Sequence, residues 1–295
     1  IVWKLGFYYN TRIAFAVHGY DQRVFFAAIF TNWIALVACA TIAAAATRAL
    51  IPTGGETWPL LGGALCFFDF FAQQGVLAGM SEGVSWLLVA IGFLGWVRRS
   101  LQVVAIILCL SIIQRETIPI VFGALSLFML RVPQESRRFH VNVLAISVVA
   151  FLAYIGMRLA YSPLPGNEQQ LSPTSFLYLL SHWNRLATRE GAFQVFLSQN
   201  LLICLGGITA LTVLAGPGAP ARPRSAIDPT TVALLLTAFV LTAVGIGTLS
   251  QSNNIGRVLS ILTPITAPLL AKGLFRLFPP QTEPPSRSNK TQSTI

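Results

Sequence analysis

The sequence predicts an all-α fold: a polytopic transmembrane bundle of about eight or nine helices. Hydrophobic residues make up 54% of the 295 positions and charged residues only 10%, whereas a soluble domain carries about 25% charged residues. Several uncharged stretches approach or exceed the ~20 residues that cross a bilayer. Basic residues stand mostly in short loops between these stretches, as in the positive-inside pattern. This composition excludes a large soluble enzyme domain, and the net charge of +10 indicates membrane topology rather than nucleic-acid binding.

The first third of the chain contains three predicted membrane helices. An interfacial segment with several aromatic residues, 1–23, precedes them. A run of four alanines, Ala43 to Ala46, predicts that the first helix packs closely against a neighbour. Turns rich in glycine separate the helices, which are expected at about 24–47, 58–78 and 84–97.

The stretch 101–130 is apolar except for Arg115, Glu116 and Thr117 at its centre. A single helix of this length would be about 45 Å long at 1.5 Å per residue, against a hydrocarbon core of about 30 Å. It would also hold two charges near mid-bilayer, where ionisable residues are costly. Pro119 disfavours helix at the residue before it. We therefore expect a hairpin of two short helices, with the charged pair at one face and the basic flanks at the other.

The second half continues the alternation of apolar and polar stretches. Residues 161–192 form the longest polar segment, and their spacing predicts an amphipathic helix lying on the outer membrane surface. A tail rich in Pro, Ser and Thr, 279–295, is expected to be disordered and cytoplasmic. Residues 1–278 then form one transmembrane domain, whose further helices are expected at about 139–160, 193–214, 230–249 and 258–277.

The hairpin places the side with more lysine and arginine in the cytoplasm and gathers polar elements on the outer face. Glu82 and Glu116 are the candidate catalytic carboxylates, because such groups bind a hydroxyl, accept its proton or hold a divalent cation. Arg115 and Arg257 are the candidate phosphate-binding residues, since guanidinium groups grip phosphate in a fork. Asn254 lies in the polar run before Arg257 and completes the predicted substrate site.

Structural roles for the same residues remain open. Arg115 and Glu116 would also serve as an ion pair that seals a helix break, Glu82 as a solvated turn acid, and Arg257 as an interfacial anchor. The four cysteines and three histidines are scattered, without metal-ligand or disulfide spacing. The sequence therefore indicates no metal or cofactor site, although the carboxylates leave a divalent cation open.

Three features of the sequence together resemble the pattern of a known protein family. They are the Ser81-Glu82-Gly83 turn that opens a span, the Gln114 to Thr117 turn that follows a basic turn and a short apolar helix, and Gly256-Arg257 before the last span. This pattern resembles the bacterial GT-C-type membrane glycosyltransferases, which use polyprenyl-phosphate-linked sugars. The resemblance covers roughly residues 20–130 and 245–278. It implies sugar transfer to an acceptor at the outer face of the cytoplasmic (inner) membrane, in building the cell envelope.

The resemblance assigns a role to each site residue, and the chain departs from the family pattern in one respect. It makes Glu82 the acid that acts on the acceptor hydroxyl, Arg115-Glu116 the charged turn, and Arg257 the residue that holds the lipid phosphate. Such enzymes usually carry their main acid in a first outer loop after an initial span, and Asp21 is the only acid before span one here. The expectation is an N-terminally truncated or divergent member. The alternatives are a transporter or flippase of a lipid-linked or anionic solute and a non-catalytic membrane subunit.

Overall fold

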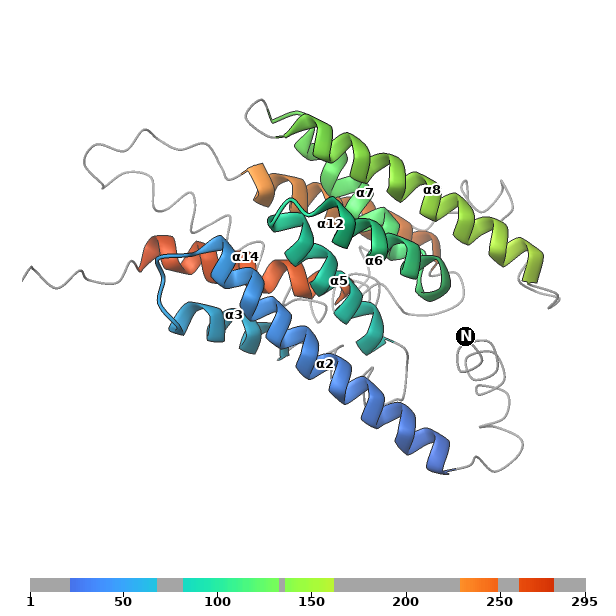
Figure 1. Ribbon diagram of the computed structural model, residues 1–295, viewed down its shortest axis with the longest axis horizontal. Helices are drawn as coiled ribbons and strands as arrows, with labels where there is room; N and C mark the ends of the chain where they lie inside the picture. Colours follow the sequence, from blue (N-terminus) through green and yellow to red (C-terminus); the bar gives the residue numbers. More distant parts are fainter. Residues whose placement is uncertain (1–21, 68–81, 133–135, 162–228, 249–259, 279–295) are drawn as a thin grey trace, which may run out of the picture.

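The computed structural model describes residues 22–67, 82–132, 136–161, 229–248 and 260–278 (Figure 1). Throughout these ranges the fold is all-α, without a strand, as the sequence predicted. The 3-10 helix η3 (Ser260–Leu262) leads into the last α-helix. The α-helices are α2 (Gln22–Leu50), α3 (Thr57–Phe67), α5 (Glu82–Val97), α6 (Leu101–Gln114), α7 (Thr117–Met129), α8 (Arg137–Tyr161), α12 (Pro229–Thr248) and α14 (Thr263–Leu277).

Most helices expected from the sequence within these ranges have nearly the expected bounds. The predictions for 24–47, 84–97, 139–160 and 230–249 correspond to α2, α5, α8 and α12. The second predicted helix is described only as far as Phe67. The interfacial segment, the amphipathic segment, the helix at 193–214 and the tail lie outside the described residues.

The prediction that residues 101–130 form two helices is confirmed. Helix α6 ends at Gln114, and Arg115 has an extended backbone with φ −166° and ψ 133°. Glu116 returns to helical angles and α7 begins at Thr117. Pro119 lies in the first turn of α7, where backbone N–H groups lack intrahelical acceptors, so its missing donor costs no hydrogen bond. The chain therefore breaks where the two charges stand.

The two short helices run in opposite directions. Helix α6 is antiparallel to α5, because Val103 lies beside Gly95 near one end and Gln114 donates a hydrogen bond to Ser85 near the other. The next helix, α8, begins beside the α5–α6 turn, where Arg99 contacts His140. Helix α7 must therefore return to that turn, and it packs mainly against α8 and α12 and only weakly against α6.

Close packing of α2 on α3 depends on small side chains. A Cβ atom at Gly62 would lie 2.0 Å from Thr47 Oγ1, and one at Gly63 would lie 2.9 Å from the Ala40 carbonyl oxygen. Ala43 and Ala46 are fully buried, which confirms the close contact predicted from the alanine run.

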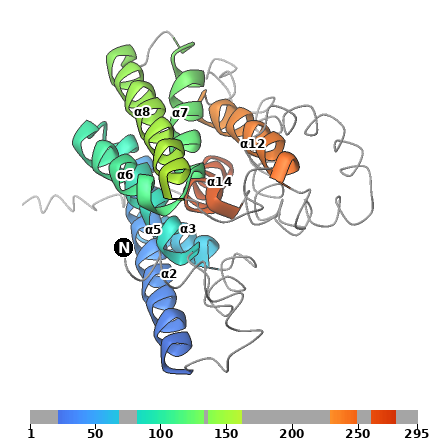
Figure 2. The same cartoon turned by 90° about the vertical axis from the view of Figure 1, so that its right-hand side faces the viewer.

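The core lies between the two long helices α2 and α8, which occupy opposite sides of the bundle in both views (Figures 1 and 2). Helix α5 contributes Trp86 and Phe93, and α7 contributes Phe122, all fully or almost fully buried. Helix α5 contacts α2, α6 and α14. Because of this central position, α5 fixes the place of the charged α6–α7 break in the bundle.

The outward faces of the long helices are apolar. Phe30, Ile34 and Val37 form an exposed stripe on α2, and Phe30 is 67% exposed. On α8, Val149 and Leu152 are 66% and 60% exposed. The segments Ile29–Leu50 and Arg137–Met157 are long and apolar enough to cross a membrane.

Candidate functional site

The bundle has two chemically different ends. The break end contains the α6–α7 break, with Arg115 and Glu116, and the start of α5 at Glu82. The arginine end lies opposite and contains the α5–α6 turn and the α7–α8 connection. Its defining residues are Arg98, Arg99, Arg131, Arg137 and Arg138.

A hydrogen bond fastens the start of α5 to the helix break. Gln114, the last residue of α6, donates from Nε2 to Ser85 Oγ at 3.1 Å. Glu82 precedes Ser85 by about one helical turn, and Arg115 follows Gln114 directly. The structure therefore brings three of the predicted site residues, Glu82, Arg115 and Glu116, to the same end of the bundle. Arg115 and Glu116 are both partly buried.

Beside the start of α5 lies a polar residue that the sequence argument missed. Asn32 of α2 is fully buried, and among the described residues neither its amide nitrogen nor its amide oxygen has a hydrogen-bond partner. It packs against Gly83, where a Cβ atom would lie 2.9 Å from both Asn32 Oδ1 and the Asn32 carbonyl oxygen. The start of α5 can approach α2 this closely only because residue 83 has no side chain. The signal was an amide inside the apolar run of the first span, since buried polar residues in such runs are costly and often functional.

Two further polar groups at this end are buried and have no hydrogen-bond partner in the part of the chain that the structure describes. They are Trp86 Nε1, one turn into α5, and Thr117 Oγ1, at the start of α7. Each orphaned group costs roughly 1–3 kcal/mol relative to a satisfied one, and the cost rises where water is excluded. Within the described ranges the same holds for Trp96 Nε1 at the arginine end and for the hydroxyls of Ser126 and Ser147, so orphaned groups are a reason to look for a ligand or water at both ends of the bundle.

The last described segment enters the bundle near the same residues. Helix η3 contacts α5 and α7, and Ser260 and Thr263 are buried where η3 passes into α14. The predicted substrate-binding residues Asn254 and Arg257 lie outside the described residues, a few positions before Ser260. Their relation to Glu82 and Glu116 therefore stays a prediction.

The arginine end holds its charges differently. The guanidinium of Arg99 lies 5.3 Å from the ring centre of Trp96 and 5.4 Å from that of Phe139. It is 2.8 Å from Nε2 of the buried His140, and because guanidinium only donates, that nitrogen accepts. Partial burial lowers the pKa of Arg99 from its usual value, although an arginine stays charged throughout the physiological range. Arg99 thus fastens the α5–α6 turn to α8.

The remaining bases of this end are exposed. Arg48, at the end of α2, pairs with Glu56 on the surface. The described residues contain no group of three or more His, Cys, Asp or Glu side chains placed to hold a metal ion. The geometry thus places charged residues at a helix break at one end of the bundle and exposed arginines at the other.

Comparison of the chain with protein-family models, with curated proteins and with solved structures found no match.

Proposed function

We propose that this chain is a multi-pass protein of the bacterial cytoplasmic (inner) membrane that transfers a sugar from a polyprenyl-phosphate donor to an acceptor at the outer face. The observation that carries the proposal is the break end, where Glu82, Arg115 and Glu116 share one end of an apolar bundle and the buried amide of Asn32 packs against the start of α5. The resemblance to GT-C-type glycosyltransferases supplies the substrate class.

Membrane insertion is supported by the surface of the bundle. Soluble proteins rarely expose broad apolar patches, whereas α2 and α8 expose Phe30, Ile34, Val149 and Leu152. Among the described residues, lysine and arginine favour the arginine end, and the positive-inside pattern places that end in the cytoplasm. The break end then lies at the outer face. Helices α6 and α7 are short for a full crossing, which suits a charged break near the outer boundary of the hydrocarbon.

The proposed chemistry divides between the carboxylates and the arginines. A carboxylate at Glu116 or Glu82 accepts the proton of the acceptor hydroxyl as that oxygen attacks the sugar. Arg115 stabilises the charge that develops on the departing polyprenyl phosphate. Arg257 and Asn254, in the polar run before η3, are assigned to the same phosphate and sugar by the resemblance. This assignment uses no metal. If the carboxylates hold a divalent cation instead, a chelator should lower the rate of sugar transfer.

The test is donor turnover by the purified full chain in lipid nanodiscs. A panel of radiolabelled polyprenyl-phosphate sugars is incubated with membrane extract as the acceptor source, and transfer is measured with and without chelator. Glu116→Gln and Arg115→Gln should each lower the rate at least about 100-fold, the usual scale for a lost acid–base or charge-stabilising group. Glu56→Gln and Arg48→Gln are the matched controls, because they alter an exposed pair beside the arginine end. Full activity in both break-end variants would overturn the assignment.

A helix break with charges also supports the second candidate, a transporter or flippase. Discontinuous membrane helices place their ends and charges at substrate sites in many transporters. The same nanodisc protein, moved into sealed vesicles, separates the two functions. Movement of an intact lipid-linked solute across the vesicle, with no sugar transferred, would favour transport. If neither process is found, the remaining hypothesis is a non-catalytic membrane subunit.

A further inference from the structure

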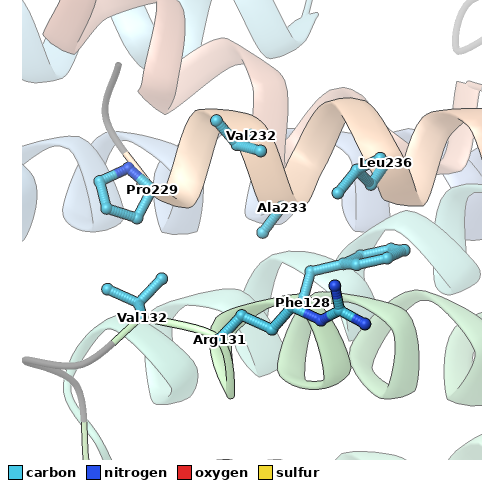
Figure 3. A pocket seen from close by; sticks show the side chains of 7 residues that line it. All are labelled: Phe128, Arg131, Val132, Pro229, Val232, Ala233 and Leu236. Atoms are coloured by element: carbon cyan, nitrogen blue, oxygen red, sulfur yellow. The ribbon is translucent and has the colours of Figure 1, made fainter. Parts of the chain in front are cut away.

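We propose that the groove between α7 and α12 binds an anionic phospholipid of the cytoplasmic leaflet, with Arg131 holding the headgroup phosphate. The proposal rests on the membrane topology given above and not on sugar transfer. Figure 3 shows the groove, which encloses about 490 Å³. This volume is within the roughly 300–1,000 Å³ typical of pockets that hold small molecules.

The two walls of the groove come from single helix faces. On α12 the lining residues are Pro229, Val232, Ala233 and Leu236, spaced as neighbours along one side of a helix. They face a turn at the end of α7 (Figure 3). That turn contributes Phe128, Arg131 and Val132. Six of the seven lining residues are apolar, so the walls suit a hydrocarbon chain.

The one charged residue of the lining is Arg131, and it is exposed. Within the described ranges its guanidinium makes no ion pair or hydrogen bond. Exposed Arg137 and Arg138 begin α8, only six and seven positions further along the chain, and α8 packs against α7. Arg131 therefore brings a cation to an otherwise apolar groove, where its guanidinium lies beside Phe128 (Figure 3), and a guanidinium binds phosphate oxygens in a bidentate contact.

This arrangement selects a phospholipid over other apolar occupants. An acyl chain needs apolar walls and its phosphate needs a cation, and the groove offers both. Basic pockets between membrane helices on the cytoplasmic side are suited to anionic headgroups, because the lipids of that leaflet carry negative charge. A helix of the same chain or of a second copy would cover the apolar walls but would leave Arg131 without an anion.

The first experiment is native mass spectrometry of the full chain in detergent, with phosphatidylglycerol or phosphatidylcholine added. The wild type should retain phosphatidylglycerol in preference to phosphatidylcholine. Arg131→Gln should lower phosphatidylglycerol affinity about fivefold, the effect of roughly 1 kcal/mol for one basic residue near anionic lipid. The matched control is Arg98→Gln, an exposed arginine at the same end but outside the groove, which should keep wild-type binding. Equal binding of the two lipids, or equal loss in both variants, would overturn the proposal.

The second experiment identifies the occupant directly. Leu236→Trp adds a large apolar side chain to a groove-lining position that is 39% exposed, so it should lower retention of both lipids without disturbing the core. A benzophenone amino acid at position 232 should form adducts with lipid in native membranes. Adducts with another part of the same chain or with a second copy would replace the lipid by that occupant and overturn the proposal. Because neither readout uses sugar transfer, an inactive enzyme that still selects phosphatidylglycerol refutes only the proposed function.

Discussion

The break end and the arginine end differ in how they hold their charged groups. At the arginine end, Arg99 contacts two aromatic rings and His140, and Arg48 pairs with Glu56. Among the described residues, the buried amide of Asn32 at the break end has no hydrogen-bond partner, and neither does the indole N–H of the buried Trp96 at the arginine end. Satisfied contacts such as those of Arg99 fix a turn in place, whereas buried polar groups without partners lower stability at either end. The two ends therefore differ in helix continuity: the break end interrupts a helix at two charged residues, and the arginine end anchors a turn through Arg99.

The largest expected effect concerns the side of the membrane that each end of the bundle faces. On a cysteine-free background, Arg115→Cys at the break end and Arg138→Cys at the arginine end should react with a membrane-impermeant maleimide from opposite sides. In right-side-out cells position 115 should label from outside, and position 138 only after the membrane is opened. The expected contrast is all or none. Labelling of both positions from one side would remove the topology on which the proposed function stands.

Removing the Arg99 contacts should be the largest stability change among the following variants. Arg99→Ala loses the hydrogen bond to His140 and two cation–π contacts, which we expect to cost about 1.5 kcal/mol, measured by thermal unfolding in detergent. Arg99 has φ +57°, a region that costs a residue with a Cβ about 1–2 kcal/mol and glycine almost nothing. Arg99→Gly should therefore be more stable than Arg99→Ala. Sugar transfer should be unchanged in both, and its loss would mean that the arginine end takes part in the reaction.

Asn32→Leu should move stability and activity in opposite directions. The substitution removes two buried groups that lack partners, and we expect a gain of about 1 kcal/mol in the free energy of unfolding. If the amide contacts substrate or a bound water at the break end, donor turnover should fall sharply while the fold becomes more stable. The neighbouring exposed substitution Thr31→Val is a suitable control, because it alters a hydroxyl that bonds only to the Ala27 carbonyl within α2. A variant that is less stable, with turnover unchanged, would make Asn32 a structural residue.

The smallest effect is expected for the surface ion pair. Glu56→Gln removes the partner of Arg48, and both side chains are mostly exposed, at 72% and 62%. Exposed pairs typically contribute little, so the unfolding free energy should change by less than about 0.5 kcal/mol. Salt titration of thermal unfolding checks this value. A larger loss would show that the arginine end depends on its charges for stability and not only for topology.

Local chemistry along the chain was sufficient to determine the helices and the break. Apolar stretches with basic ends predict helices such as α2, α5, α8 and α12 almost residue by residue. The Arg115-Glu116 break followed from helix length and from Pro119. The same reasoning placed Glu82 and Glu116 on one face, because antiparallel connections through short turns leave few alternatives.

Only the tertiary structure decided which polar groups lie together in the interior. The adjacency of Asn32 to Gly83 depends on how α2 and α5 rotate about their axes, and the sequence pattern of a helix buried on several sides does not specify that rotation. The same holds for Arg99, whose contacts with Phe139 and His140 join segments about forty positions apart. The sequence by itself determined where the chain turns and where charges cannot be buried. Packing decided which of them meet, because contacts across helices depend on side-chain shape rather than on hydropathy.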